Sequence, residues 1–60
     1  MSSRQVLQRL FKDGWYIVNQ SGSHVQLKHN IKKGKVTVPH PKKDLKEKTI
    51  RNILKQAGLE

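Results

Sequence analysis

A histidine follows two small residues in the segment Gly22-Ser23-His24, and it opens a run in which apolar and polar residues alternate. Successive side chains of a strand point to opposite faces, so Val25 and Leu27 would face one side and His24 the other. Histidine changes its charge near neutral pH and can therefore take or give a proton during catalysis. A lone histidine on a solvated strand is more often an ordinary polar residue, so the pattern alone leaves both roles open.

The chain contains three histidines, which raises the question of a shared metal site. His24 and His29 are five positions apart on the same expected strand, so their side chains would point to opposite faces. The sequence has no cysteine, which excludes a thiolate zinc site. We therefore expect no metal site and no cofactor. His29 and His40 are interpreted as polar residues at strand ends, with His40 also a candidate for the rim of a site around His24.

The charge of the chain points to an anionic partner. Thirteen Lys and Arg residues against four Asp and Glu residues give a formal net charge of +9 over 60 residues. Solubility alone requires less net charge than this in a small domain. A positive field of this size favours a polyanion, with RNA or DNA as the first candidate, although an acidic protein could use the same field.

Several lysines are candidates for contacts to RNA phosphates. Lys28 would share the face of His24, and the others cluster in the expected turn after residue 29 and in the proline-containing loop after residue 39. Any one of them could equally be a solvated charge that contributes little to binding. The prediction of RNA binding therefore depends on the lysines taken together. The predicted RNA-binding residues are Lys28, Lys32, Lys33, Lys35, Lys42 and Lys43.

Hydrophobic periodicity indicates the elements that would position these residues. Apolar residues recur at helical spacing between residues 6 and 11, after Ser2 and Ser3, either of which could cap the helix. Gly14 would end this helix. Strand-forming residues then occupy 15–20, 22–29 and 35–39, with turns expected at 20–22 and 30–34.

The C-terminal segment predicts a second amphipathic helix, with an apolar stripe of Ile50, Ile53, Leu54 and Ala57. Gly58 would end it, and it could begin at a capping box of Asp44 and Glu47 or nearer Thr49. The order α-β-β-β-α predicts an α+β fold in which a three-stranded antiparallel sheet carries both helices on one face. His24 would lie on the other, solvated face.

Length and hydropathy limit the architecture further. Sixty residues predict a single domain, 1–60, with a small core. No apolar run approaches the ~18 residues that a membrane span needs, and the first ten residues lack the hydrophobic segment of a signal peptide. We therefore expect a soluble cytoplasmic protein with no membrane partner. Trp15 or Tyr16 could stack on a base, but Trp15 is expected in the core.

Three segments of the sequence resemble the HicA family, also called YcfA-like, which comprises small toxins of bacterial and archaeal toxin–antitoxin pairs. The segments are DGWYIVNQSGSHVQLKH, KGKVTVPHPKKDL and TIRNILKQAGL, and they cover nearly the whole chain. Their most specific parts are Gly22-Ser23-His24 and the closing residues 53–59. Many relatives have a proline and a glycine before the threonine of the last helix, where this chain has Lys46-Glu47-Lys48-Thr49, so the start of that helix stays open.

The resemblance implies a fold similar to double-stranded-RNA-binding domains, cleavage of mRNA, and inhibition by a cognate HicB-type antitoxin. It also implies that His24 is the catalytic residue. Cleavage without a metal requires a group that takes the proton from the ribose 2′-hydroxyl, and histidine can do this. Lys28 and Tyr16 are candidates for a second proton-transfer group, and the sequence favours neither.

Two other functions fit the same composition. A non-catalytic RNA-binding module could share the fold, the charge and the solvated sheet, and Gly22-Ser23-His24 is the feature that favours a ribonuclease over it. A DNA-binding or purely protein-binding domain is the other alternative, although no recognition-helix signature appears. For the ribonuclease, we expect an antitoxin with an acidic surface that covers the sheet around His24.

Overall fold

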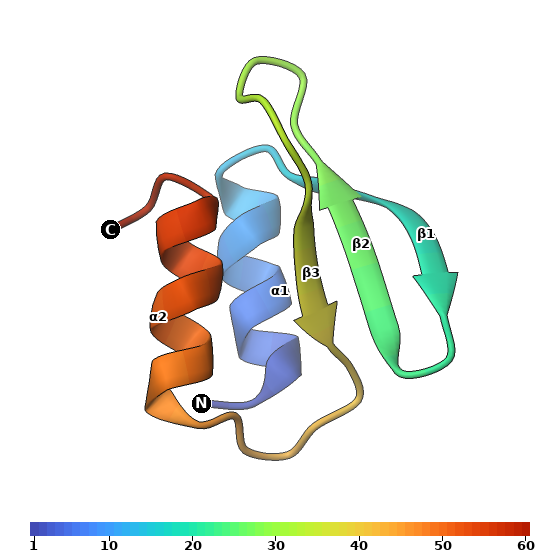
Figure 1. The fold of residues 1–60 in the computed structure, drawn as a ribbon, viewed down its shortest axis with the longest axis vertical. Helices are drawn as coiled ribbons and strands as arrows, with labels where there is room; N and C mark the ends of the chain where they lie inside the picture. The colour runs from blue at the N-terminus through green and yellow to red at the C-terminus, as the bar shows by residue number, and fades with distance from the viewer.

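The protein folds as two helices packed on one face of an antiparallel sheet, in a computed structural model that describes residues 1–60 (Figure 1). The elements are α1 (Ser3–Lys12), β1 (Tyr16–Ser21), β2 (His24–Lys28), β3 (Val36–Pro39) and α2 (Glu47–Gln56). This arrangement confirms the predicted α-β-β-β-α fold. No helix is long and apolar enough to cross a membrane.

The sheet has the strand order β1-β2-β3, with both strand pairs antiparallel. Strand β2 is central, and its inward side chains Val25 and Leu27 are completely buried. They pack in one core with residues of both helices and of β3. The buried core residues are Val6, Leu7, Leu10, Trp15, Val25, Leu27, Val36, Val38, Leu45, Ile53 and Ala57.

Helix α1 begins at a capping box. The Ser2 hydroxyl accepts the Gln5 backbone N–H at 3.2 Å, and the Gln5 side chain accepts the Ser2 backbone N–H at 2.8 Å. Two otherwise unpaired backbone donors of the first turn are thus satisfied. Of the two serines predicted as caps, Ser2 is the cap, and Ser3 is the first residue of the helix, buried on its inner side.

Helix α2 begins without the predicted capping box, so that prediction is wrong. Lys46 is the N-cap and makes no hydrogen bond through its side chain. The reason is the preceding residue: Leu45 is buried in the core, and its backbone N–H donates to the Met1 carbonyl at 2.8 Å. These contacts hold the chain outside the helix until Lys46, and the helix starts at Glu47, two residues before the alternative start at Thr49.

Strand β1 extends beyond the cover of the two helices, at the edge of the sheet farthest from α2 (Figure 1). Ile17 pairs with Leu27 and faces the same side of the sheet. Leu27 is completely buried, whereas 45% of Ile17 is exposed. The helical layer therefore covers β2 and β3 and leaves the inner face of β1 open.

Candidate active site and nucleic-acid interface

His24 is the first residue of β2, and its exposed side chain lies on the face of the sheet opposite the helices. Its strand neighbours are Ser21 on β1 and Pro39 on β3. The imidazole makes no hydrogen bond or ion pair with any other side chain or backbone group. His24 thus lies on the solvated face, as predicted, with both ring nitrogens available to a substrate.

The turn before His24 consists of Gly22 and Ser23, because Ser21 already pairs with His24. The turn predicted at residues 20–22 is therefore displaced by one to two residues. Gly22 has φ +57° while Ser23 has a negative φ, the pattern of a type II′ hairpin turn with glycine first. An added Cβ at Gly22 would meet open space, so the backbone conformation, and not crowding, requires glycine here.

A chain of hydrogen bonds holds this turn against the first turn of α1. The His40 backbone N–H donates to the Ser23 carbonyl at 2.8 Å, and the His40 ring Nδ1 lies 2.7 Å from the Ser3 hydroxyl. The same hydroxyl accepts the Lys42 backbone N–H at 2.8 Å, and the Ser3 backbone N–H donates to the Lys42 carbonyl at 2.9 Å. The position of His24 thus depends on contacts between the first turn of α1 and the loop after β3.

The sequence pattern predicted Ser3 only as a possible helix cap and did not indicate this role. A signal was present: Ser3 precedes Val6, Leu7 and Leu10 by three, four and seven positions, so it falls on the apolar stripe of α1. A polar residue at a core-facing position must find a partner inside the protein. Ser3 is only 1% exposed, and it finds its partners in His40 and Lys42.

Replacement of Ser3 by alanine is expected to lower the free energy of unfolding by about 1–3 kcal/mol, because the Lys42 N–H loses its partner inside the protein. Thermal or urea unfolding measures this loss. The matched control is Ser2→Ala, which removes the N-cap and should cost about 1 kcal/mol. An effect of Ser3→Ala no larger than about 0.5 kcal/mol, as for an ordinary surface residue, would contradict the role assigned to this hydroxyl.

Neutral polar side chains surround His24 on the solvated face. Gln26 is the next outward residue of β2, and it pairs with Asn19 and Thr37. Lys28, paired with Tyr16, is four residues from His24, or about 13 Å along an extended strand. The two candidates for a second proton-transfer group therefore lie at the far end of β2 and not beside the imidazole.

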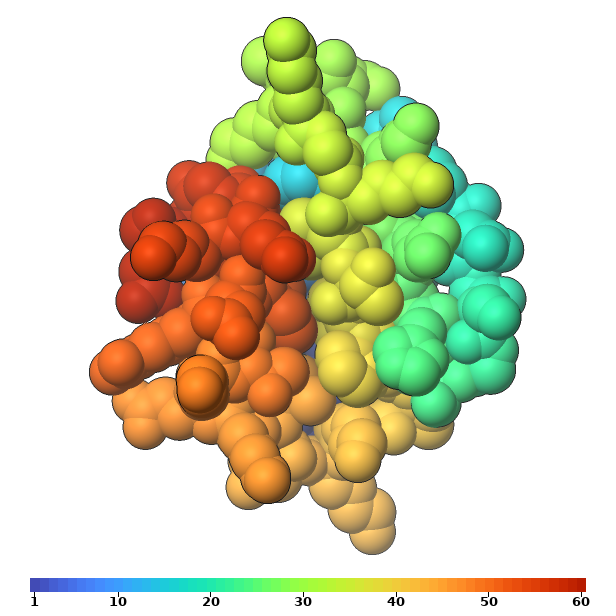
Figure 2. Space-filling view, viewed as in Figure 1, coloured from blue at the N-terminus to red at the C-terminus, as the bar shows by residue number.

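The predicted RNA-binding lysines divide between two ends of the molecule. The loop between β2 and β3 projects at one end and the loop between β3 and α2 at the other, in the view of Figure 2. Lys33 and Lys35 belong to the first loop. Lys42 and Lys43 belong to the second, which starts beside the turn that carries His24. All four are exposed, so a bound RNA would have to extend between the ends to meet all of them.

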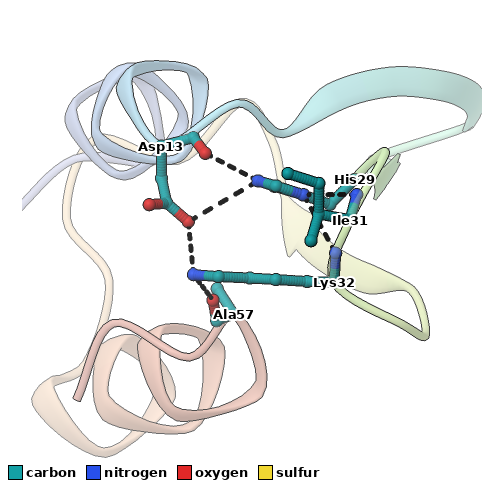
Figure 3. A network of polar contacts seen from close by, with 5 residues as sticks. All are labelled: Asp13, His29, Ile31, Lys32 and Ala57. Carbon is teal, nitrogen blue, oxygen red and sulfur yellow. Dashed lines mark hydrogen bonds and ion pairs between the residues drawn. The ribbon is translucent and has the colours of Figure 1, made fainter.

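Lys32 differs from the other lysines, because its ammonium is already occupied (Figure 3). Its Nζ donates to Asp13 Oδ2 at 2.5 Å and to the Ala57 carbonyl at 2.9 Å. These contacts join the end of α1, the β2–β3 loop and the end of α2. Two of the three donors of this ammonium are used, and its charge is paired with Asp13, so a phosphate gains less from Lys32 than from the unpaired lysines. We therefore do not include Lys32 among the proposed RNA contacts.

His29 completes the same network (Figure 3). Its Nε2 donates to the Asp13 carbonyl at 2.7 Å, and its Nδ1 accepts the backbone N–H groups of Ile31 and Lys32 at 3.0 and 3.1 Å. The ring lies edge-on to Trp15, with centroids 5.3 Å apart. Strand β2 ends at Lys28, one residue earlier than predicted, because His29 turns inward to these partners. No three metal-ligating side chains lie together anywhere in the chain.

The network predicts an acid-dependent loss of stability. The hydrogen bond from Lys32 holds the pKa of Asp13 below its ordinary value of 3.8. The folded state therefore binds this proton more weakly than the unfolded state does. The stabilisation is complete above pH 3.8 and is lost as the pH falls through the lower pKa of the folded state.

Thermal unfolding between pH 7 and pH 2 tests this expectation. Lys32→Met removes the main cause of the shift, so the variant should lose less of its stability below pH 3.8 than the parent does. Lys33→Met, at the neighbouring exposed lysine, is the control and should keep the parental pH profile. Parallel profiles of Lys32→Met and the parent would show that this ion pair contributes nothing.

Comparisons with known proteins agree with this geometry. The family profile described as the HicA toxin of bacterial toxin–antitoxin systems matches residues 3–59. A chain in a solved structure, titled a toxin–antitoxin complex from Streptococcus pneumoniae, superimposes with a TM-score of 0.83. It is 30% identical in sequence, and the alignment covers 98% of each chain. No curated protein matches the sequence.

Proposed function

Because the chain belongs to the family of HicA toxins of bacterial toxin–antitoxin systems, we propose that it is an endoribonuclease that cleaves mRNA without a metal ion. The observation that supports this activity best is the placement of His24, an unpaired and exposed imidazole beside a fixed hairpin turn. In this proposal the protein is the toxin of a type II pair, acts in the cytoplasm and needs no cofactor.

His24 acts as the general base in the proposed reaction. It takes the proton of a ribose 2′-hydroxyl, the 2′-oxygen attacks the adjacent phosphorus, and the bond from phosphorus to the 5′-oxygen breaks. The products are a 2′,3′-cyclic phosphate and a new 5′-hydroxyl. The leaving oxygen takes its proton from water, since neither Lys28 nor Tyr16 lies beside the imidazole. The imidazolium then returns its proton to solvent.

The exposed lysines hold the RNA by its phosphates. Lys42 and Lys43 contact the backbone near the scissile bond, because their loop is tied to the turn of His24 through His40. Lys28 contacts it farther along β2, and Lys33 and Lys35 at the opposite end. The RNA thus runs along the solvated face of the sheet, opposite the helices.

A HicB-type antitoxin with an acidic surface inhibits the toxin in this proposal. A similar chain of known structure is titled part of a toxin–antitoxin complex. The net charge of +9 favours a negatively charged protein partner as well as RNA. Covering the solvated face around His24 would block access of the RNA.

Purified protein, freed of antitoxin, should cleave an mRNA in the presence of a metal chelator and leave 2′,3′-cyclic phosphate ends. Gel analysis of the fragments and chemical analysis of their ends provide the measurement. Cleavage that stops when the chelator is added would contradict the metal-independent mechanism. RNA binding without any cleavage would favour the alternative, a non-catalytic RNA-binding module with the same fold.

A further inference from the structure

The open inner face of β1 forms one wall of a groove on the helical side of the sheet. The groove has a volume of about 960 Å³ and lies between α1 and β1. Leu7 and Phe11 of α1 line one side, and Ile17 and Val25 of the sheet line the other. Phe11 and Ile17 are each 45% exposed, so the floor presents large apolar side chains to solvent.

The segment that contains β1 and most of β2 has no charged residue. Residues 14–27 include no Lys, Arg, Asp or Glu, in a chain where 28% of residues are charged. Edge strands are usually protected by charged side chains, proline or covering elements. Strand β1 is an edge strand with neither charge nor proline, and its one protection is the bulge between Ile17 and Asn19. An uncharged edge that exposes Tyr16, Ile17 and Val18 is suited to a partner that covers it.

The rim of the groove, in contrast, is basic. Arg4 lies on it from α1, and Lys42 and Lys43 lie on it from the loop after β3. All three are exposed, and their side chains form no ion pair. A matching occupant has apolar side chains for the floor and carboxylates for the rim.

We propose that this α1–β1 groove is the docking site for an amphipathic, acidic segment of the antitoxin. This inference rests on the proposed toxin–antitoxin pairing. A second copy of the chain is a poor occupant, because it would bring another net charge of +9 to the basic rim. The antitoxin suits the groove better, since a similar chain occurs in a toxin–antitoxin complex.

An antitoxin segment bound in the groove would also weaken RNA binding, although His24 lies on the other face of the sheet. Lys42 and Lys43 belong both to the rim and to the proposed RNA contacts nearest His24. Carboxylates that pair with these two lysines remove them from the phosphates. The groove thus contributes to inhibition independently of any antitoxin surface that covers the imidazole.

Three consecutive residues of β1 provide a matched test, because Tyr16, Ile17 and Val18 are exposed to nearly the same extent, 43%, 45% and 45%. Only Ile17 lines the groove. Binding of the purified antitoxin, encoded by the adjacent gene, is measured by calorimetry on the full chain. Ile17→Ser and Phe11→Ser should each weaken binding by about tenfold or more, as for central interface residues. Val18→Ser should change it by less than about threefold.

A second pair of variants changes exposed residues of α1, where loss of the fold is not expected. Thermal unfolding of every variant checks that the fold is intact. Arg4→Gln, at the rim, should weaken antitoxin binding, and Arg9→Gln, on the same helix but outside the groove, should not. RNA cleavage by free Ile17→Ser and Phe11→Ser should stay at the parental rate, since neither residue contacts RNA in the proposal.

The outcomes separate the two proposals. If folded Ile17→Ser and Arg4→Gln bind the antitoxin as tightly as the parent does, the groove assignment is wrong. The proposed toxin function is not affected by that result. Absence of a complex between the parent and the adjacent gene product overturns the pairing, and the groove assignment with it. Weak binding of the groove variants together with normal cleavage supports the groove as a site for the antitoxin and not for RNA.

Discussion

Replacement of His24 by alanine is expected to lower the rate of RNA cleavage by about 10²- to 10⁴-fold, the usual contribution of a positioned general base. The fold should persist, because the side chain is exposed and its removal leaves no cavity. RNA affinity should change little, since the lysines that hold the phosphates remain. Single-turnover cleavage, RNA binding and thermal unfolding of parent and variant measure these three quantities separately.

The matched control for His24→Ala is Thr37→Ala, which truncates another exposed residue on the same face of the sheet. It should cleave at nearly the parental rate. Expression of the two variants in cells gives an independent comparison, in which only His24→Ala should fail to arrest growth. A His24→Ala protein that cleaves as fast as the parent would remove His24 from the mechanism.

RNA affinity is expected to fall by about 10²-fold between 50 and 200 mM salt if five lysines each neutralise one phosphate, with a log–log slope of about −0.7 per contact on single strands. The five are the predicted lysines whose ammonium groups are free of ion pairs: Lys28, Lys33, Lys35, Lys42 and Lys43. Titrations of a non-cleaving variant with labelled RNA at several salt concentrations measure the slope.

Variants assign this salt dependence to particular lysines. The double change Lys42→Gln and Lys43→Gln should make the slope shallower by about 1.4, which corresponds to two lost phosphate contacts. Lys32→Gln should leave the slope unchanged, because its ammonium is held by Asp13 and Ala57. A salt-independent affinity would exclude an electrostatic mode of binding, and an equal effect of Lys32→Gln would restore that lysine to the RNA-binding set.

Local sequence patterns predicted the fold and the placement of His24. The alternation around Val25 and Leu27 has the period of a strand, and that period alone decides which face receives the histidine. The same reasoning predicted Trp15 in the core, where it is only 2% exposed. These features depend on residues near one another in the chain, which is why the sequence was sufficient.

Contacts between distant residues explain what the sequence did not reveal. The predicted capping box at Asp44 does not form, because Leu45 is held by the core and by Met1, forty-four positions away. The role of Lys32 depends on Asp13 and Ala57, nineteen and twenty-five positions away. Periodicity gives no information on which loop lysine meets a carboxylate from another element, so one of the six predicted RNA-binding lysines proved to be engaged within the protein.

The hydrogen bonds from Ser3 to His40 and Lys42 also limit when the turn before His24 can be fixed during synthesis of the chain. A nascent chain that has emerged only as far as β2 contains His24 but lacks the residues that hold its turn, because Ser23 and Ser3 find their partners at positions 40 and 42. Residues 40–42 must leave the ribosome before these contacts close. A partly synthesised chain that lacks these residues should therefore not hold the turn of His24 in place.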